Sequence, residues 1–98
     1  MDWAAMFAYF FSGAILANGV PHFVKGIVGE IHQSPFGKRS HPVVNVLWGA
    51  ANFLGGSVLL AWAWDRVEAG TGEWVALGLG GIILAVSLAY YWGRPGGR

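Results

Sequence analysis

The sequence contains no cysteine and very little charge, and both absences narrow the class of protein that it can encode. Without cysteine there is no disulfide bond, thiolate metal site or cysteine nucleophile. Charged residues make up only 11% of the chain, which is about half the share usual in a soluble domain. A small soluble domain has a high ratio of surface to volume and needs polar residues to cover its exterior. The composition therefore predicts an exterior that faces lipid.

A strong excess of either sign of charge is also missing, and so are the motifs of the common enzyme families. The formal net charge is only +1, which is too small to indicate a nucleic-acid partner. The chain has no nucleotide-binding glycine loop, no G-x-S-x-G and no H-E-x-x-H. An enzyme is therefore the less favoured class, and no catalytic residue is predicted.

What the sequence does contain is three long uncharged segments, at residues 3–20, 43–64 and 74–92. As a helix, the first would extend about 27 Å, close to the thickness of the hydrocarbon core of a bilayer. No positively charged region precedes it, so we interpret it as a retained span and not as a cleaved signal peptide. The predicted fold class is an all-α membrane protein with three transmembrane helices, and residues 1–98 are expected to form a single membrane domain.

The longest polar stretch, residues 18–42, separates the first two spans and holds all three histidines. Residues 21–33 are too polar to span, and at about 100° per residue their apolar side chains gather on one face. We predict a short amphipathic helix lying in the membrane interface, with a loop that re-enters the membrane as the alternative. Residues 34–37, S-P-F-G, fit a tight turn. Ser40 or His41 is then expected to cap the second span.

The basic residues predict the orientation of the chain in the membrane. Lys25, Lys38 and Arg39 lie in the first connection, and Arg94 and Arg98 lie in the C-terminal tail, whereas the N-terminus carries no basic side chain. The positive-inside rule then places the N-terminus outside and the C-terminus in the cytoplasm. The tryptophans agree, since most of them fall at the opposite boundary, as in an aromatic belt.

Small residues indicate where the helices pack. In the second span Asn45, Gly49, Asn52 and Gly56 share one face because they are spaced by four, three and four. An amide that faced lipid would leave its donors unsatisfied, so Asn52 is expected to face protein or water. The predicted helix-packing residues are Gly13, Ala17, Gly49, Gly56, Gly81 and Ala85, and Ala51 with Gly55 forms a further pair of small residues.

A candidate binding cluster lies at the predicted cytoplasmic boundary. Asn18, His22 and Asn45 fall near this boundary and are expected to hydrogen-bond to one another, fixing the turn out of the first span. Asn52 extends the cluster towards mid-span. Because His and Asn side chains both bind carbonyl oxygens, a quinone or small-metabolite site is one hypothesis for this cluster.

The histidines are the candidate metal ligands of the chain. His22, His32 and His41 are separated by ten and nine residues, which matches no helical ligand motif. No metal site is therefore predicted, and the identity of any cofactor is left open. Lys38 and Arg39 are expected to contact anionic lipid headgroups.

Three runs carry a resemblance to other proteins: N-G-V-P-H-F at residues 18–23, S-P-F at 34–36 and V-N-V-L-W-G at 44–49. This pattern resembles that of a group of small, uncharacterised bacterial integral membrane proteins, and the likeness covers residues 12–60. The resemblance implies a location in the bacterial inner membrane. It assigns no catalytic residue.

Taken together, these features favour a non-catalytic subunit of a homo- or hetero-oligomeric membrane complex, because three helices enclose little interior. The expected partners are the lipid bilayer, further copies of the chain or a larger membrane complex, and not nucleic acid. One alternative is a homo-oligomeric channel or carrier for a small neutral or anionic solute, lined by Asn45, Asn52 and Ser57. The other is a histidine-based cofactor, quinone or metal site at the cytoplasmic boundary.

Overall fold

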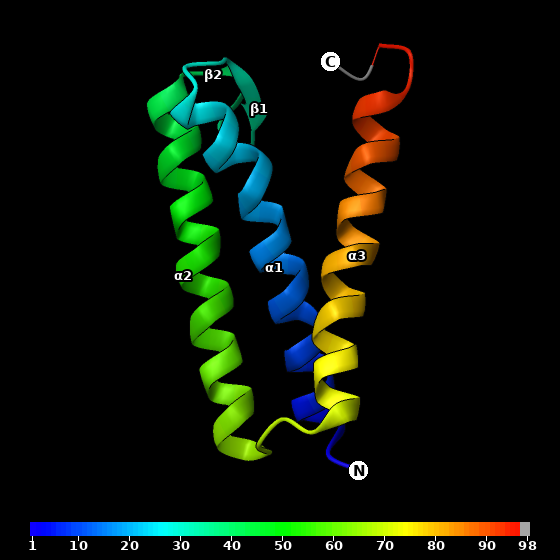
Figure 1. The fold of residues 1–98 in the computed structure, drawn as a ribbon. Coiled ribbons are helices and arrows are strands. Elements are labelled where there is room, and N and C mark those ends of the chain that lie inside the picture. The colour runs from blue at the N-terminus through cyan, green and yellow to red at the C-terminus, as the bar shows by residue number, and fades with distance from the viewer. Residues whose placement is uncertain (97–98) are drawn as a thin grey trace.

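The computed structural model describes residues 1–96 and consists of three long helices and one short hairpin (Figure 1). In chain order the elements are α1 (Trp3–Ile27), β1 (His32–Ser34), β2 (Gly37–Ser40), α2 (Pro42–Arg66) and α3 (Thr71–Gly93). All three helices are long and apolar enough to cross a membrane. This confirms the predicted helical fold with three candidate membrane spans, and each helix is longer than the uncharged segment that predicted it.

The structure shows no separate interfacial helix over residues 21–33, so this prediction is wrong. Instead α1 continues through Pro21 to Ile27. A proline removes one helix hydrogen bond, a loss that membrane helices tolerate when neighbouring groups satisfy the freed carbonyl. The helix ends in a Schellman motif at Gly29, whose φ is +77°. The Glu30 N–H donates to the Lys25 carbonyl, and the Gly29 N–H donates to the carbonyl of Gly26.

The amphipathic pattern of residues 21–33 does not come from a helix lying in the membrane interface, and burial against α2 explains part of it. Val24 and Ile27 are exposed, and they lie on the outer side of α1. His22 and Gly26 are buried, and Gly26 packs against Pro42 and its neighbours at the start of α2. Val24 and Ile27 are thus turned outwards, whereas His22 and Gly26 are turned towards α2, as expected where lipid and not water surrounds a helix. Lys25, close to the end of α1, is exposed as well.

The chain between α1 and α2 forms an antiparallel hairpin. β1 pairs with β2, with Ser34 opposite Gly37, so the turn lies at the predicted S-P-F-G residues. The hydroxyl of Ser34 accepts a hydrogen bond from the Phe36 N–H at 3.1 Å. His41 then caps α2 as predicted, because its Nδ1 accepts from the Val43 N–H at 3.0 Å.

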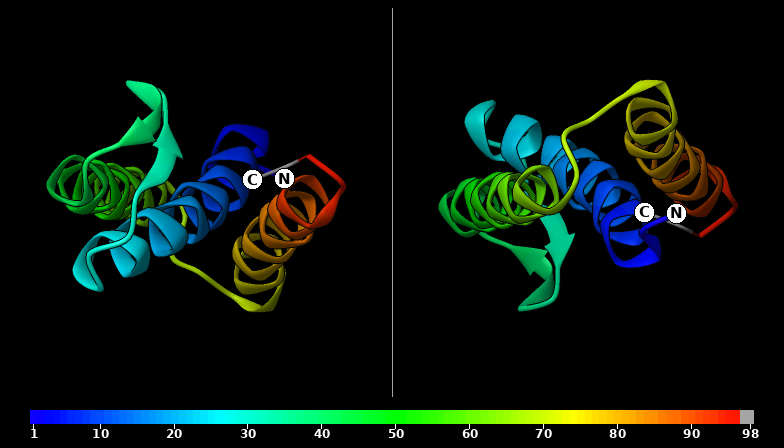
Figure 2. Two further views of the ribbon diagram at one scale, coloured as in Figure 1. Left: turned by 90° about the horizontal axis from the view of Figure 1, so that it is seen from above. Right: turned by 90° about the horizontal axis from the view of Figure 1, so that it is seen from below.

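Helix α1 is the centre of the molecule and packs against both other helices (Figures 1 and 2). Glycine makes close approach possible on both sides. Gly80 of α3 lies against the backbone carbonyl of Phe10. Gly19 of α1 and Gly49 of α2 lie against each other, and a Cβ on Gly19 would come within 2.8 Å of the Gly49 carbonyl oxygen. Without a side chain between them, the helix backbones can make contact directly.

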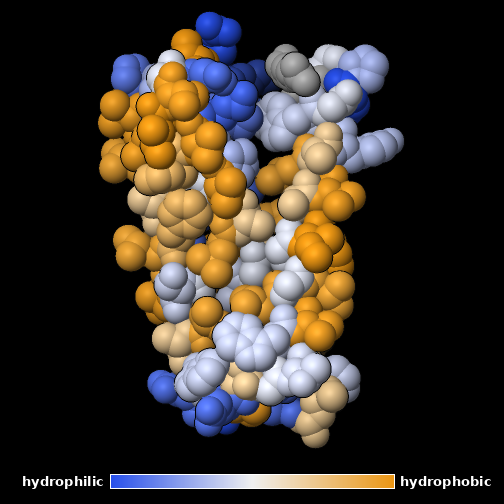
Figure 3. Space-filling model, viewed as in Figure 1, coloured by the Kyte–Doolittle hydropathy of each residue, from blue (hydrophilic) through white to orange (hydrophobic). Residues whose placement is uncertain are grey.

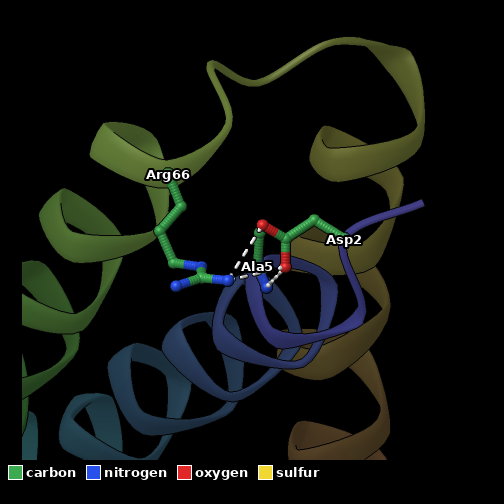
Figure 4. Close-up of polar contacts among 3 residues, drawn as sticks. All are labelled: Asp2, Ala5 and Arg66. Atoms are coloured by element: carbon green, nitrogen blue, oxygen red, sulfur yellow. Dashed lines mark hydrogen bonds and ion pairs between the residues drawn. The ribbon is translucent and has the colours of Figure 1, made fainter.

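The end of the molecule away from the hairpin is held by polar contacts of Asp2 (Figure 4). Its carboxylate caps α1 by accepting from the Ala5 N–H at 3.0 Å, and it pairs with Arg66 at 3.2 Å. The hydrogen bond from Ala5, together with that from Arg66, lowers the pKa of Asp2 below its ordinary value. Asp2 is therefore ionised at neutral pH, which suits a carboxylate at the positive end of a helix dipole.

Tyr9 also stabilises the end of the molecule away from the hairpin, through a hydrogen bond of its buried side chain. Its ring is fully buried, and its hydroxyl donates to the carbonyl of Val67 just after α2. We expect Tyr9→Phe to lower the free energy of unfolding in detergent by about 1 kcal/mol, because the carbonyl loses its donor. The exposed Tyr90 provides the matched control. If Tyr90→Phe lowered the midpoint of thermal or SDS unfolding equally, the hydrogen bond would have no part in stability.

Candidate functional site

Two hydrogen-bonded pairs of side chains join α1 to α2. Asn18 donates to Oδ1 of Asn52 at 3.1 Å, and Asn52 itself donates to the carbonyl of Trp48 at 2.9 Å. One turn further along α1, Nδ1 of His22 lies 2.9 Å from Oδ1 of Asn45. Residues four apart on one helix and seven apart on the other lie on a single face of each. The structure thus brings the four residues of the predicted cluster together as two successive pairs.

Asn45 is the most connected side chain of the cluster. It is fully buried, and its amide nitrogen donates to the carbonyls of His32 at 2.9 Å and Ser40 at 3.3 Å. These two bonds fix the orientation of the amide, so Oδ1 faces His22 as an acceptor. His22 therefore carries its proton on Nδ1 and donates it to Asn45. One side chain thereby ties α1, α2 and both strands together.

His32 lies next to this pair and extends it towards α3. Its ring centroid is 5.3 Å from that of His22 and 4.7 Å from that of Trp92. Burial lowers the pKa of His32 below its ordinary value, and the nearby His22 and Lys25 lower it further. The ring is therefore neutral at pH 7. Its Nε2 is buried and has no hydrogen-bond partner within residues 1–96.

The three histidines do not converge on one point. His22 and His32 are neighbours, but Nδ1 of His41 is used in capping α2. Within the part of the chain that the structure describes, no three His, Cys, Asp or Glu side chains are grouped so that they could hold a metal ion. The geometry supports a histidine pair at the end of the helix bundle, engaged with asparagine on one side and tryptophan on the other.

A basic cavity opens beside His32, between the hairpin and the end of α3. Its volume is about 870 Å³, and the basic residues that line it are Lys25, Lys38, Arg39 and Arg94. Lys38 and Arg39 are exposed on β2. The structure thus places the two predicted headgroup-binding residues at this cavity.

An apolar groove of about 370 Å³ lies between α1 and α3. It shares Pro21 and Trp92 with the basic cavity, so the two spaces adjoin. Its remaining lining residues are Ala17, Val20, Ala85, Leu88 and Ala89.

Most of the small residues predicted to pack helices lie at contacts. Gly13 and Gly81 face each other between α1 and α3, with Ala17 beside them. Gly49 lies against α1, and Gly56 meets Leu16 of α1. Ala85 is exposed and lines the apolar groove, so it does not serve as a helix contact there.

Three further glycines, which were not among the predicted helix-packing residues, also lie at close helix contacts: Gly19, Gly26 and Gly80. A signal for the first two exists, because Ala5, Ser12, Gly19 and Gly26 recur every seven residues and all four are buried. Gly49, Gly56 and Ala63 repeat the spacing on α2 and are buried too. A seven-residue repeat of small residues therefore marks the two helix faces that meet.

The residues suggested as a solute path do not share a surface within one chain. Asn45 and Asn52 are buried between α1 and α2, whereas Ser57 is exposed on α2. A path lined by all three would therefore have to cross the body of α2.

The fold and these contacts define a small helical protein with three helices able to span a membrane. Comparison with protein-family models, curated proteins and solved structures finds no match.

Proposed function

We propose that the protein is a non-catalytic subunit of an oligomeric membrane complex. The supporting observation is the way in which its buried polar side chains are used. The amides of Asn45 and Asn52 and the ring of His22 all hydrogen-bond within the chain. Polar groups that serve transport at membrane depth usually face a water-filled path, and these face a helix interface. Their role is to set the packing and register of α1 and α2.

The outer surfaces of α2 and α3 supply the area that an oligomer needs. In α3, Gly80 is the one buried residue within the described part of the chain. On α2, Leu47, Leu54 and Val58 are each exposed by more than 60% (64%, 69% and 69%). Lipid or another subunit must cover these faces.

The outer face of α2 also carries a pair of small residues, Ala51 and Gly55, that does not lie at the contact with α1. Both are exposed, and no atom lies within 4 Å of the position that a Cβ on Gly55 would take. Small residues four apart allow a second helix to approach closely. A second copy of the chain, packed through this face, is the simplest partner.

We expect Gly55→Leu to weaken self-association in mild detergent about tenfold, because the leucine holds the partner helix away. Gly78→Leu is the matched control, since Gly78 also has open space around it but lies on α3. Sedimentation or cross-linking across a range of protein-to-detergent ratios measures the effect. A wild-type chain that stayed monomeric in both detergent and bilayers would contradict self-association. Native purification with identification of co-purifying chains would then test a hetero-oligomer.

We further propose that the protein resides in the inner membrane of a bacterium, with the hairpin and C-terminus in the cytoplasm. Hydrophilic residues gather at both ends of the molecule, on either side of an apolar belt (Figure 3). Among residues 1–96 the hairpin end carries four basic side chains: Lys25, Lys38, Arg39 and Arg94. The opposite end carries Arg66, which pairs with Asp2. By the positive-inside rule, the end with more basic side chains faces the cytoplasm. A reporter fused after Arg98 that worked only outside the cytoplasm would refute this orientation.

A further inference from the structure

The basic cavity and the apolar groove together form an amphipathic site, because they adjoin at Pro21 and Trp92. The groove runs between two helices that are apolar enough to span a membrane. The cavity sits above it, beside the hairpin. A ligand that filled both spaces would need an apolar tail and a polar head, and the head would have to suit a basic environment.

The charges around the cavity favour an anion. Within the described residues of this end, Glu30 is the one acid, and it is paired with Lys25 at 2.8 Å. Arg94 is held at the mouth by stacking on the ring of Tyr91, with its guanidinium carbon 3.8 Å from the ring centroid. Lys38 and Arg39 have no acidic partner within residues 1–96. The cavity is therefore left with an uncompensated positive charge.

The aromatic residues place the mouth of this site at the depth of lipid headgroups. Tyr91 and Trp92 line the cavity at the end of α3, where amphipathic rings prefer the membrane–water boundary. Below them the wall of the groove is made of alanine, leucine, valine and proline side chains. A ligand with its polar head at the level of Trp92 would thus have an apolar space directly beside that head.

We propose that this composite site binds one anionic phospholipid. Its phosphate lies among Lys38, Arg39 and Arg94, and one acyl chain lies in the groove between α1 and α3. The basic residues select the charge of the headgroup, and the groove distinguishes a lipid from a free phosphate ion. Basic pockets beside membrane helices on the cytoplasmic side bind anionic headgroups in this way.

Native mass spectrometry of the full chain in detergent tests the proposal, with phosphatidylglycerol and phosphatidylcholine of identical acyl chains as probes. We expect phosphatidylglycerol to bind the more tightly. A basic residue near an anionic headgroup strengthens binding by about fivefold, so Lys38→Gln with Arg39→Gln should weaken phosphatidylglycerol binding by about 25-fold. The charge-preserving pair Lys38→Arg with Arg39→Lys should retain most of the affinity. Both residues are exposed, so the fold should survive in either variant.

A second pair of variants tests the groove. Ala89→Phe fills it and should weaken the binding of both lipids, whereas Ala61→Phe, at an exposed position of α2, should change neither. Equal affinities for the two lipids, or full affinity in the glutamine pair, would overturn the role of charge. Inorganic phosphate that competed as well as the lipid, or unchanged binding in Ala89→Phe, would overturn the lipid as the ligand.

Discussion

Replacing Gly80 with alanine is expected to detach α3 from α1. A Cβ at this position would overlap the backbone carbonyl oxygen of Phe10 and come within 2.7 Å of its carbonyl carbon. The obstacle is main chain, so no side chain can rotate away from it. We expect the free energy of unfolding to fall by about 3 kcal/mol, at the upper end of the range for overpacked contacts. No other residue of α3 is buried within the described chain, so the helix depends on this contact and on the neighbouring approach of Leu77 and Gly81 to Gly13.

Spin labels can measure this separation without background, because the chain contains no cysteine. Labels at the exposed positions Val24 of α1 and Ile83 of α3 should give one narrow distance distribution in the wild type and a broad one in Gly80→Ala. Gly78→Ala is the matched control on the same helix, since its Cβ would meet open space. Alanine there gains about 1 kcal/mol of helix propensity. If the two variants behaved alike, the close contact at Gly80 would be unimportant.

Asn45→Leu is expected to release the hairpin and destabilise the joint between α1 and α2. The substitution preserves size but leaves His22 and the carbonyls of His32 and Ser40 without their partner. Each buried polar group left unpaired costs about 1–3 kcal/mol, so we expect a loss of about 3 kcal/mol or more. Faster amide exchange over residues 32–40, together with a lowered unfolding midpoint, would report both effects.

Asn52→Leu provides the comparison for this prediction, because it makes the same chemical change on the same helix. Asn52 hydrogen-bonds to Asn18 and to a carbonyl of its own helix. We therefore expect Asn52→Leu to lower the free energy of unfolding by only about 1 kcal/mol and to leave the hairpin unchanged. An equal loss in both variants, with unchanged exchange in the hairpin, would show that Asn45 does not organise that end.

The three helices were predictable from the sequence, because uncharged runs of their length have few other stable conformations in a membrane. The end of α1 was not. Pro21 normally ends a helix in water, and the pattern that follows it resembles an interfacial helix. The continuation of α1 beyond Pro21 is explained by tertiary contact. Gly26 continues the seven-residue repeat of buried positions, His22 is buried about one turn before it, and α2 covers both.

The candidate site was predictable in part. Asn18, His22, Asn45 and Asn52 were identifiable because amides and imidazoles near membrane depth need partners. The pairing of Asn18 with Asn52, and the role of Asn45 in holding the hairpin, depend on contacts across the fold. The strands are only three and four residues long. No local pattern in such short segments predicts a hairpin whose backbone carbonyls bind a side chain of α2.

The central position of α1 also implies an order of assembly during synthesis. Asn18 and His22 precede their partners in the chain, so α1 would enter a bilayer with both side chains unpaired, and they would be satisfied only once α2 had followed. No side-chain hydrogen bond joins α3 to the rest within residues 1–96, since the polar side chains of α3 and its flanks bond locally. Insertion would thus proceed through an α1–α2 pair locked by amides, and α3 would then dock on a surface that already exists.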